Sequence, residues 1–160
     1  MFIFKNIFVF SLIFLISSCS LKTVEEIQKF DNYSVEIETP GDKNNSYFKE
    51  NLKRLFYTKS NVLKKYLIKT AISFQSTDTL SVSGTAVLKS TKAKIDFHLI
   101  DKDTNKIIKS DTIFTFPALS SSSSSLYSQQ KGIDHIKERL IKSSAKTLFM
   151  QINIIIRRLS

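Results

Sequence analysis

The chain has 160 residues and a formal net charge of +10, with 24 lysines and arginines against 14 aspartates and glutamates. This length suits one domain with a buried core. A single cysteine excludes an intrachain disulfide, and three glycines are too few for a glycine-rich phosphate-binding loop.

Residues 1–18 have the composition of a bacterial signal peptide. Lys5 is the only charged residue in this stretch, and a nearly unbroken apolar run extends from Ile7 to Ile16. The run is shorter than the about 20 residues that a membrane-spanning helix needs. It ends in Ile16-Ser17-Ser18-Cys19, which resembles the lipobox of bacterial lipoproteins. We therefore expect a signal peptide over 1–18 and lipidation at Cys19; the alternative is a free thiol in an ordinary secreted protein.

A lipid anchor at Cys19 would put the basic chain in the cell envelope, out of reach of nucleic acid. The abundant polyanions there are lipid headgroups and the phosphates of lipid A, although an AT-rich genome would explain the lysine content equally well. In lipoproteins of this type a residue other than aspartate after the cysteine, here Ser20, usually routes the protein to the outer membrane. We expect an anchor on the periplasmic side of that membrane, a tether over 19–30 and one domain over 31–160.

The domain is predicted to open with a strand and a helix. Alternating residues predict a strand over 32–39, and Pro40-Gly41-Asp42 predicts the turn that ends it. A helix is expected to begin at Ser46, whose hydroxyl suits an N-cap. Lys49, Lys53 and Arg54 are interpreted as its solvated flank. The apolar face of this helix is predicted to carry Phe48, Leu52, Leu55 and Phe56.

A long hairpin is predicted next, with a period of two from Lys65, a bulge or kink at Ser76-Thr77-Asp78 and a turn at Ser83-Gly84. Residues 101–106 imitate the start of a calcium loop. However, Lys106 stands where the loop needs glycine, and Thr112 where it needs glutamate, so we expect a plain hairpin there. The residues expected to face the core are Tyr66, Ile68, Thr70, Ile72 and Phe74, then Ala93, Ile95, Phe97 and Leu99.

A last strand over 108–116 ends at Pro117, and the serines at 120–125 predict a mobile loop. A C-terminal helix follows, in which Arg157 and Arg158 suit the helix dipole. Its apolar stripe is expected to carry Ile133, Ile136, Leu140, Ser144, Leu148, Ile152 and Ile155. The element order predicts an α+β two-layer sandwich, with two helices packed on one face of a four-stranded, mostly antiparallel sheet.

No pattern of catalysis is evident in the sequence. His98 and His135 are the only histidines, and they lie on different predicted elements without a cysteine partner, which argues against a metal site. A nucleophile elbow is also missing. We therefore expect a binding or structural protein without a cofactor, and not an enzyme.

The stretch Leu80–Ile155 resembles the lipopolysaccharide-assembly lipoprotein family LptE, in a divergent form. It combines a hairpin at a glycine, the segment Ile95–Asp101, a serine-bearing loop before Leu126-Tyr127 and a final helix from Ile133. The resemblance implies two helices on a four-stranded sheet. It also implies a plug inside the outer-membrane β-barrel LptD, with which the family inserts lipopolysaccharide into the outer membrane.

Two departures from the family pattern restrict what can be carried over. The family often continues Cys-Gly-aromatic after the signal peptide, whereas this chain has Cys19-Ser20-Leu21. Family members bind lipopolysaccharide through basic residues and can carry one at the hairpin tip, where this chain has Ser83-Gly84. No lipid-contact residue is therefore assigned from the family.

The alternation itself suggests a basic surface. If Ala93, Ile95, Phe97 and Leu99 face the helices, their neighbours face away. Such a patch could pair with lipopolysaccharide phosphates; the alternative is a solvated sheet face that its lysines keep soluble. The residues expected on this face are Lys69, Lys92, Lys94, His98 and Lys109, of which the four lysines are the candidate lipopolysaccharide contacts.

The function that these observations favour is a non-catalytic outer-membrane lipoprotein that assembles with an LptD-like barrel and helps insert lipopolysaccharide. One alternative is an auxiliary lipoprotein subunit of an envelope lipid-transporting ABC system. The other is a periplasmic hydrolase with an unrecognised site.

Overall fold

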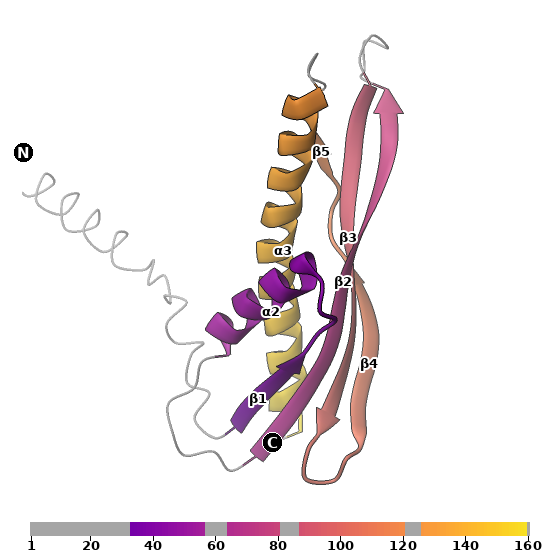
Figure 1. Cartoon of the computed structure of the whole chain (residues 1–160). Coiled ribbons are helices and arrows are strands. Elements are labelled where there is room, and N and C mark those ends of the chain that lie inside the picture. Colours follow the sequence, from indigo (N-terminus) through magenta and orange to yellow (C-terminus); the bar gives the residue numbers. More distant parts are fainter. Residues whose placement is uncertain (1–32, 57–63, 81–86, 121–125, 160) are drawn as a thin grey trace, which may run out of the picture. The chain divides into compact units, whose positions relative to one another are not determined.

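The computed structural model describes residues 33–56, 64–80, 87–120 and 126–159 (Figure 1). Contacts divide the chain into two units, Met1–Phe30 and Asp31–Ser160, and every described element belongs to the second. The predictions for the signal peptide, the tether, Cys19 and the Ser83-Gly84 turn lie outside the described residues. The elements are β1 (Tyr33–Glu38), α2 (Lys43–Leu55), β2 (Lys64–Leu80), β3 (Val87–Asp101), β4 (Ile107–Phe114), β5 (Ala118–Ser120) and α3 (Leu126–Arg157).

The strands form one mixed sheet in the order β1-β2-β3-β4, and β5 pairs with β3 beyond the end of β4. β1 runs parallel to β2, and the other pairs are antiparallel. Parallel neighbours need a crossover connection, which α2 provides. Both helices cover one side of the sheet (Figure 1). The predicted two-layer α+β sandwich is confirmed, with the short strand β5 in addition to the expected four.

The core lies between the helices and the helix-side face of β2 and β3. Ala93, Ile95 and Leu99 have no exposed surface, as their period of two predicted. Ile72 pairs with Ile95, and directly opposed residues share one face of a sheet. The helices bury Phe48 and Leu52 from α2, and Leu140, Ile141, Leu148 and Ile152 from α3.

The start of α2 differs from the prediction. Asp42, and not Ser46, is the N-cap: its Oδ1 accepts hydrogen bonds from the backbone N–H groups of Asn44 and Asn45, each at 3.0 Å. Aspartate and serine are both good N-caps, and the apolar stripe that guided the prediction begins only at Phe48. Leu55, expected on the buried face, is 38% exposed.

Two further features of the strands differ from expectation. Of the bulge or kink predicted at Ser76–Asp78, the bulge is absent, because β2 pairs with β3 without interruption from Tyr66 to Leu80. The polar Ser76 is accommodated by a hydroxyl–hydroxyl hydrogen bond with the buried Thr91, 2.9 Å long. Ser120, assigned to the serine loop, pairs with Lys89 as the end of β5, while 121–125 lie outside the described residues.

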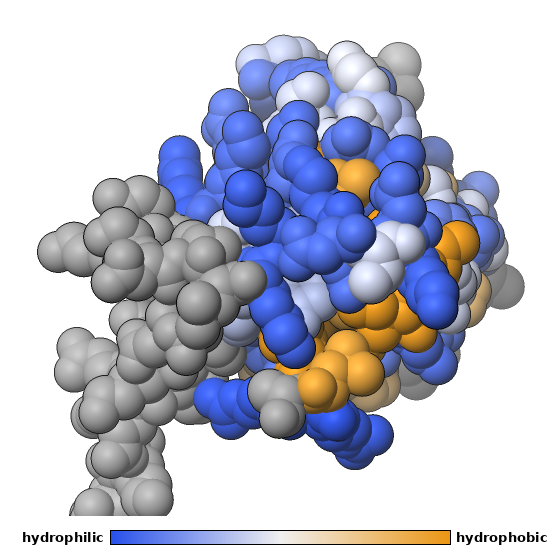
Figure 2. All heavy atoms as spheres, turned by 90° about the horizontal axis from the view of Figure 1, so that it is seen from below, coloured by the Kyte–Doolittle hydropathy of each residue, from blue (hydrophilic) through white to orange (hydrophobic). Residues whose placement is uncertain are grey.

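Apolar side chains reach the surface at the end of the domain where α3 finishes and β1 begins. These two elements meet there, because Tyr33 Oη donates a hydrogen bond to Asn153 Oδ1 at 2.5 Å. Seen from this end, hydrophobic patches lie among hydrophilic groups (Figure 2). Ile154 is 52% exposed and Leu159 is 49% exposed. Among the described helices, none has the length and apolar character that crossing a membrane requires.

Asn45 joins α2 to the sheet. The pairing of β1 with β2 stops at Glu38 and Lys69, so the peptide groups of Ile72 have no strand beside them on that edge. The buried Asn45 side chain takes the place of a strand: its Oδ1 accepts from Ile72 N at 2.8 Å, and its Nδ2 donates to Ile72 O at 3.2 Å. Both backbone polar groups of the buried residue Ile72 are thereby satisfied.

We predict that Asn45→Ala destabilises the domain by about 1–3 kcal/mol, because a buried donor and acceptor at Ile72 lose their partner. The free energy of unfolding from chemical denaturation would measure this loss. Asn44→Ala is the matched control, since only the backbone N–H of Asn44 takes part in the cap. Equal stability of the two variants would contradict a structural role for the Asn45 side chain.

Candidate functional site

The open face of the sheet, opposite the helices, carries three of the four lysines predicted as phosphate contacts. Lys69 lies directly across from His98, Lys92 from Gln75 and Lys94 from Ser73. On β3 these positions alternate with buried residues that face the helices, so their side chains point away from the core. The prediction that Lys69, Lys92, Lys94 and His98 share this face is therefore confirmed.

Lys109 lies on the other face, and the expectation that it joins the patch is wrong. Its partner in the register is the buried Leu99, and direct partners share a face. Lys109 therefore points to the helix side at the exposed sheet edge, where its Nζ lies 3.6 Å from Asp111 Oδ2. The alternation of β4 is ambiguous in the sequence, because Ile107-Ile108 and Ile113-Phe114 each place two apolar residues in succession.

Carboxylates accompany the lysines of the open face. Lys69 Nζ lies 3.3 Å from Glu38 Oε2, and Lys94 Nζ lies 2.9 Å from Asp96 Oδ2. Hydrogen bonds from Thr112 and Lys94 lower the pKa of Asp96, which favours its charged form. Lys92 Nζ lies 5.4 Å from the ring centre of Phe114, a cation–π contact. The surface that the sequence suggested as basic is thus one of mixed charge.

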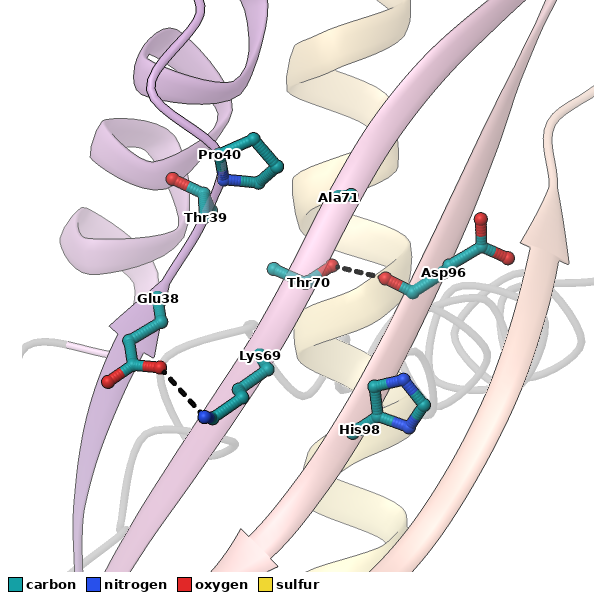
Figure 3. Close-up of a pocket in the computed structure, with 8 residues that line it drawn as sticks. All are labelled: Glu38, Thr39, Pro40, Lys69, Thr70, Ala71, Asp96 and His98. Carbon is teal, nitrogen blue, oxygen red and sulfur yellow. Dashed lines mark hydrogen bonds and ion pairs between the residues drawn. The ribbon is translucent and has the colours of Figure 1, made fainter.

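A hollow of about 350 Å³ opens on this face where β1 ends (Figure 3). Thr70 Oγ1 donates a hydrogen bond to the backbone oxygen of Asp96 at 2.9 Å, and His98 Nδ1 lies 2.7 Å from Ser110 Oγ. The Asp96 carboxylate points away from the hollow and accepts from Thr112 at 2.6 Å. These contacts hold neighbouring strands together, since Thr70 joins β2 to β3 and His98 joins β3 to β4. The hollow is lined by Glu38, Thr39, Pro40, Lys69, Thr70, Ala71, Asp96 and His98.

The turn between β3 and β4 is held by the side chain that suggested a calcium loop. Asp101 Oδ1 accepts from Asp103 N at 2.8 Å and from Thr104 N at 3.3 Å, and these bonds lower the pKa of Asp101. The predicted hairpin is confirmed by the antiparallel pairing of β3 with β4. In the part of the chain that the structure describes, no three His, Cys, Asp or Glu side chains gather as a metal site requires.

Basic residues concentrate on the helix layer, a feature that the sequence analysis did not recognise. It assigned Lys53 to a solvated flank and Arg157 to the helix dipole, each on its own helix. In the fold α2 and α3 lie against each other in one layer. Their basic residues are Lys43, Lys49, Lys53 and Arg54 on α2, and Lys131, Lys137, Arg139, Lys142, Lys146 and Arg157 on α3.

Comparison with known proteins shows the fold. No protein-family model and no curated protein sequence matches the chain. Among solved structures, the chain is similar to a Caulobacter crescentus protein named as a lipoprotein, with a TM-score of 0.59, 11% identity, and coverage of 79% of this chain and 92% of that one. It is also similar to a minor lipoprotein from Acinetobacter baumannii, with a TM-score of 0.55, 15% identity, and coverage of 76% and 90%. Rare lipoprotein B from Shewanella oneidensis gives a TM-score of 0.55, 8% identity, and coverage of 79% and 98%.

Proposed function

We propose that this chain is a non-catalytic lipoprotein of the bacterial cell envelope, anchored at Cys19 to the periplasmic side of the outer membrane. The observation that carries the proposal is the joint occurrence of a lipobox-like sequence and this fold. Residues 1–19 have the pattern of a lipoprotein signal. The domain that follows has a fold found in proteins named as lipoproteins, and nearly the whole length of those proteins is covered.

Replacing Cys19 with Ala should abolish incorporation of labelled fatty acid and leave an uncleaved precursor, because the thiol is the acceptor of the lipid. Metabolic labelling followed by electrophoresis would measure both effects. The wild-type chain in the same cells is the positive control. Fatty-acid label that persists in the Ala variant would contradict the anchor.

We further propose that the domain assembles with an LptD-like outer-membrane β-barrel and helps insert lipopolysaccharide. Support comes from the family resemblance over Leu80–Ile155 and from the small sandwich domain that the resemblance implied. The hollow of about 350 Å³ on the sheet face agrees with a binding role, because ligand sites are concave.

Depleting the protein should leave lipopolysaccharide on the periplasmic side and the barrel misassembled, since the domain would act as a stoichiometric subunit. Surface lipopolysaccharide and the folded state of the barrel would be measured, together with a pull-down from detergent-solubilised envelopes. Normal surface lipopolysaccharide after complete depletion would overturn this function. Recovery of an inner-membrane transporter in the pull-down would favour the auxiliary subunit of a lipid-transporting ABC system.

The lysines of the open sheet face give a sharper test of lipopolysaccharide binding. Changing Lys69, Lys92 and Lys94 together to Gln should weaken binding by up to about 100-fold and flatten its salt dependence, because exposed charges each contribute about 0–1 kcal/mol. Lys109→Gln is the matched control, since Lys109 lies on the opposite face of the same sheet. Unchanged binding by the folded triple variant would assign these lysines to solubility alone.

A further inference from the structure

The exposed side of α3 carries a stripe of basic and apolar residues. Arg139, Lys142, Lys146, Met150, Ile154 and Arg157 recur at helical spacing and are all exposed, and we call them the outer stripe of α3. The opposite side of the same helix buries Leu140, Leu148 and Ile152 in the core. Met150 is 47% exposed and Ile154 is 52% exposed, so the stripe combines cations with accessible apolar surface.

The outer stripe differs in charge from the sheet face. No acidic residue occurs between Arg139 and the end of the chain. The acidic residues of the helix layer are Glu50 on α2 with Asp134 and Glu138 on α3, and all three line one hollow at the N-terminal end of the stripe. On the sheet, by contrast, carboxylates lie beside Lys69, Lys94 and Lys102. The long field of positive charge therefore follows α3 from Arg139 onward.

The domain begins at the C-terminal end of the outer stripe. Its first strand, β1, starts at Tyr33, whose hydroxyl donates a hydrogen bond to Asn153 in the last turns of α3. Residues 19–32 can span at most about 50 Å when fully extended. The helix from Arg139 to Arg157 is about 27 Å long at 1.5 Å per residue. A lipid on Cys19 would thus leave enough chain for the whole stripe to reach a bilayer surface.

We propose that the outer stripe of α3 lies on the surface of an anionic phospholipid bilayer. Its lysines and arginines face the headgroup phosphates, and Met150 and Ile154 enter the interfacial region. Two half-exposed apolar side chains give little affinity by themselves. The stripe therefore acts once the anchor has brought the domain to the surface, and it fixes which side of the domain faces the bilayer. This inference rests on the proposed lipid anchor and is independent of the barrel partner.

The test uses the full lipidated chain reconstituted into vesicles of phosphatidylcholine, with or without phosphatidylglycerol. Because Cys19 carries the lipid, an added cysteine is the single free thiol. An environment-sensitive fluorophore on Met150→Cys should become brighter and blue-shifted on the anionic vesicles only. The same probe on Ser73→Cys, an exposed position of the open sheet face, should stay in water. Salt near 1 M, where the screening length is about 3 Å, should return the Met150 probe to water.

Substitution of the cations tests the charge itself. Arg139→Gln, Lys142→Gln and Lys146→Gln together should shift the ratio of bound to unbound domain by up to about 100-fold, since each basic residue near an anionic surface contributes about 1 kcal/mol. A triple Gln variant of Lys65, Lys106 and Lys109, which are exposed and lie on the sheet and its β3–β4 turn, is the matched control and should behave like the wild type. Thermal unfolding would establish that both variants fold.

Three results would overturn the inference. A Met150 probe that stays in water while the chain floats with the anionic vesicles would leave the anchor intact and remove the stripe from the membrane. Equal loss of vesicle binding in the two triple variants would also remove the stripe from the membrane, because lysines outside the stripe would then contribute as much to binding. A wild-type chain that floats with neither type of vesicle would overturn the anchor, and this inference with it.

Discussion

The side-chain alternation of β3 determines the rest of the domain. Ala93, Ile95, Phe97 and Leu99 are at most 1% exposed and form the floor on which α2 and α3 pack, while Lys92, Lys94 and His98 point to the other side. A shift of one residue in the register would exchange these two sets and remove the core. The fifteen-residue strand pairs with β2 on one edge and with β4 and β5 in succession on the other. Both helices and both candidate surfaces therefore depend on this one strand.

The same alternation separates two kinds of charged surface. On the sheet, cross-strand pairing brings acids beside lysines, as with Glu38 and Lys69. On α3 the exposed residues from Arg139 to Arg157 include no acid, so their charges add. An exposed ion pair contributes little to stability, whereas a field of one sign acts on a partner over about 10 Å at 0.1 M salt. In the described domain, the excess of positive charge therefore lies mainly on the helix layer and not on the sheet.

The sequence predicted those features that one-dimensional periodicity determines. The inward residues of β2 and β3 alternate cleanly, and the fold class followed from their order with the two helices. Lys109 was misplaced because adjacent apolar pairs at each end of β4 leave its alternation ambiguous, and only pairing with β3 decides it. The N-cap of α2 was misplaced because Asp42 and Ser46 both suit the position. β5 was missed because three residues carry no period, and it forms by pairing with a stretch of β3 that β4 leaves open.

The edges of the sheet restrict how a partner can bind. An exposed strand edge can recruit another strand, and proteins prevent this with short edge strands, prolines and charges directed inward. β1 has six residues and is followed by Pro40, and the neighbouring edge of β2 is occupied at Ile72 by the Asn45 side chain. On the other edge, β4 directs Lys109 and Asp111 to the helix side, the side on which an added apolar strand would have to bury its residues. These parts of the edges disfavour strand addition, whereas β2 from Phe74 to Leu80 pairs, among the described strands, with β3 alone. On the faces of the domain, side chains and not backbone groups supply the contacts, and the mixed-charge sheet face and the outer stripe of α3 differ in their chemistry.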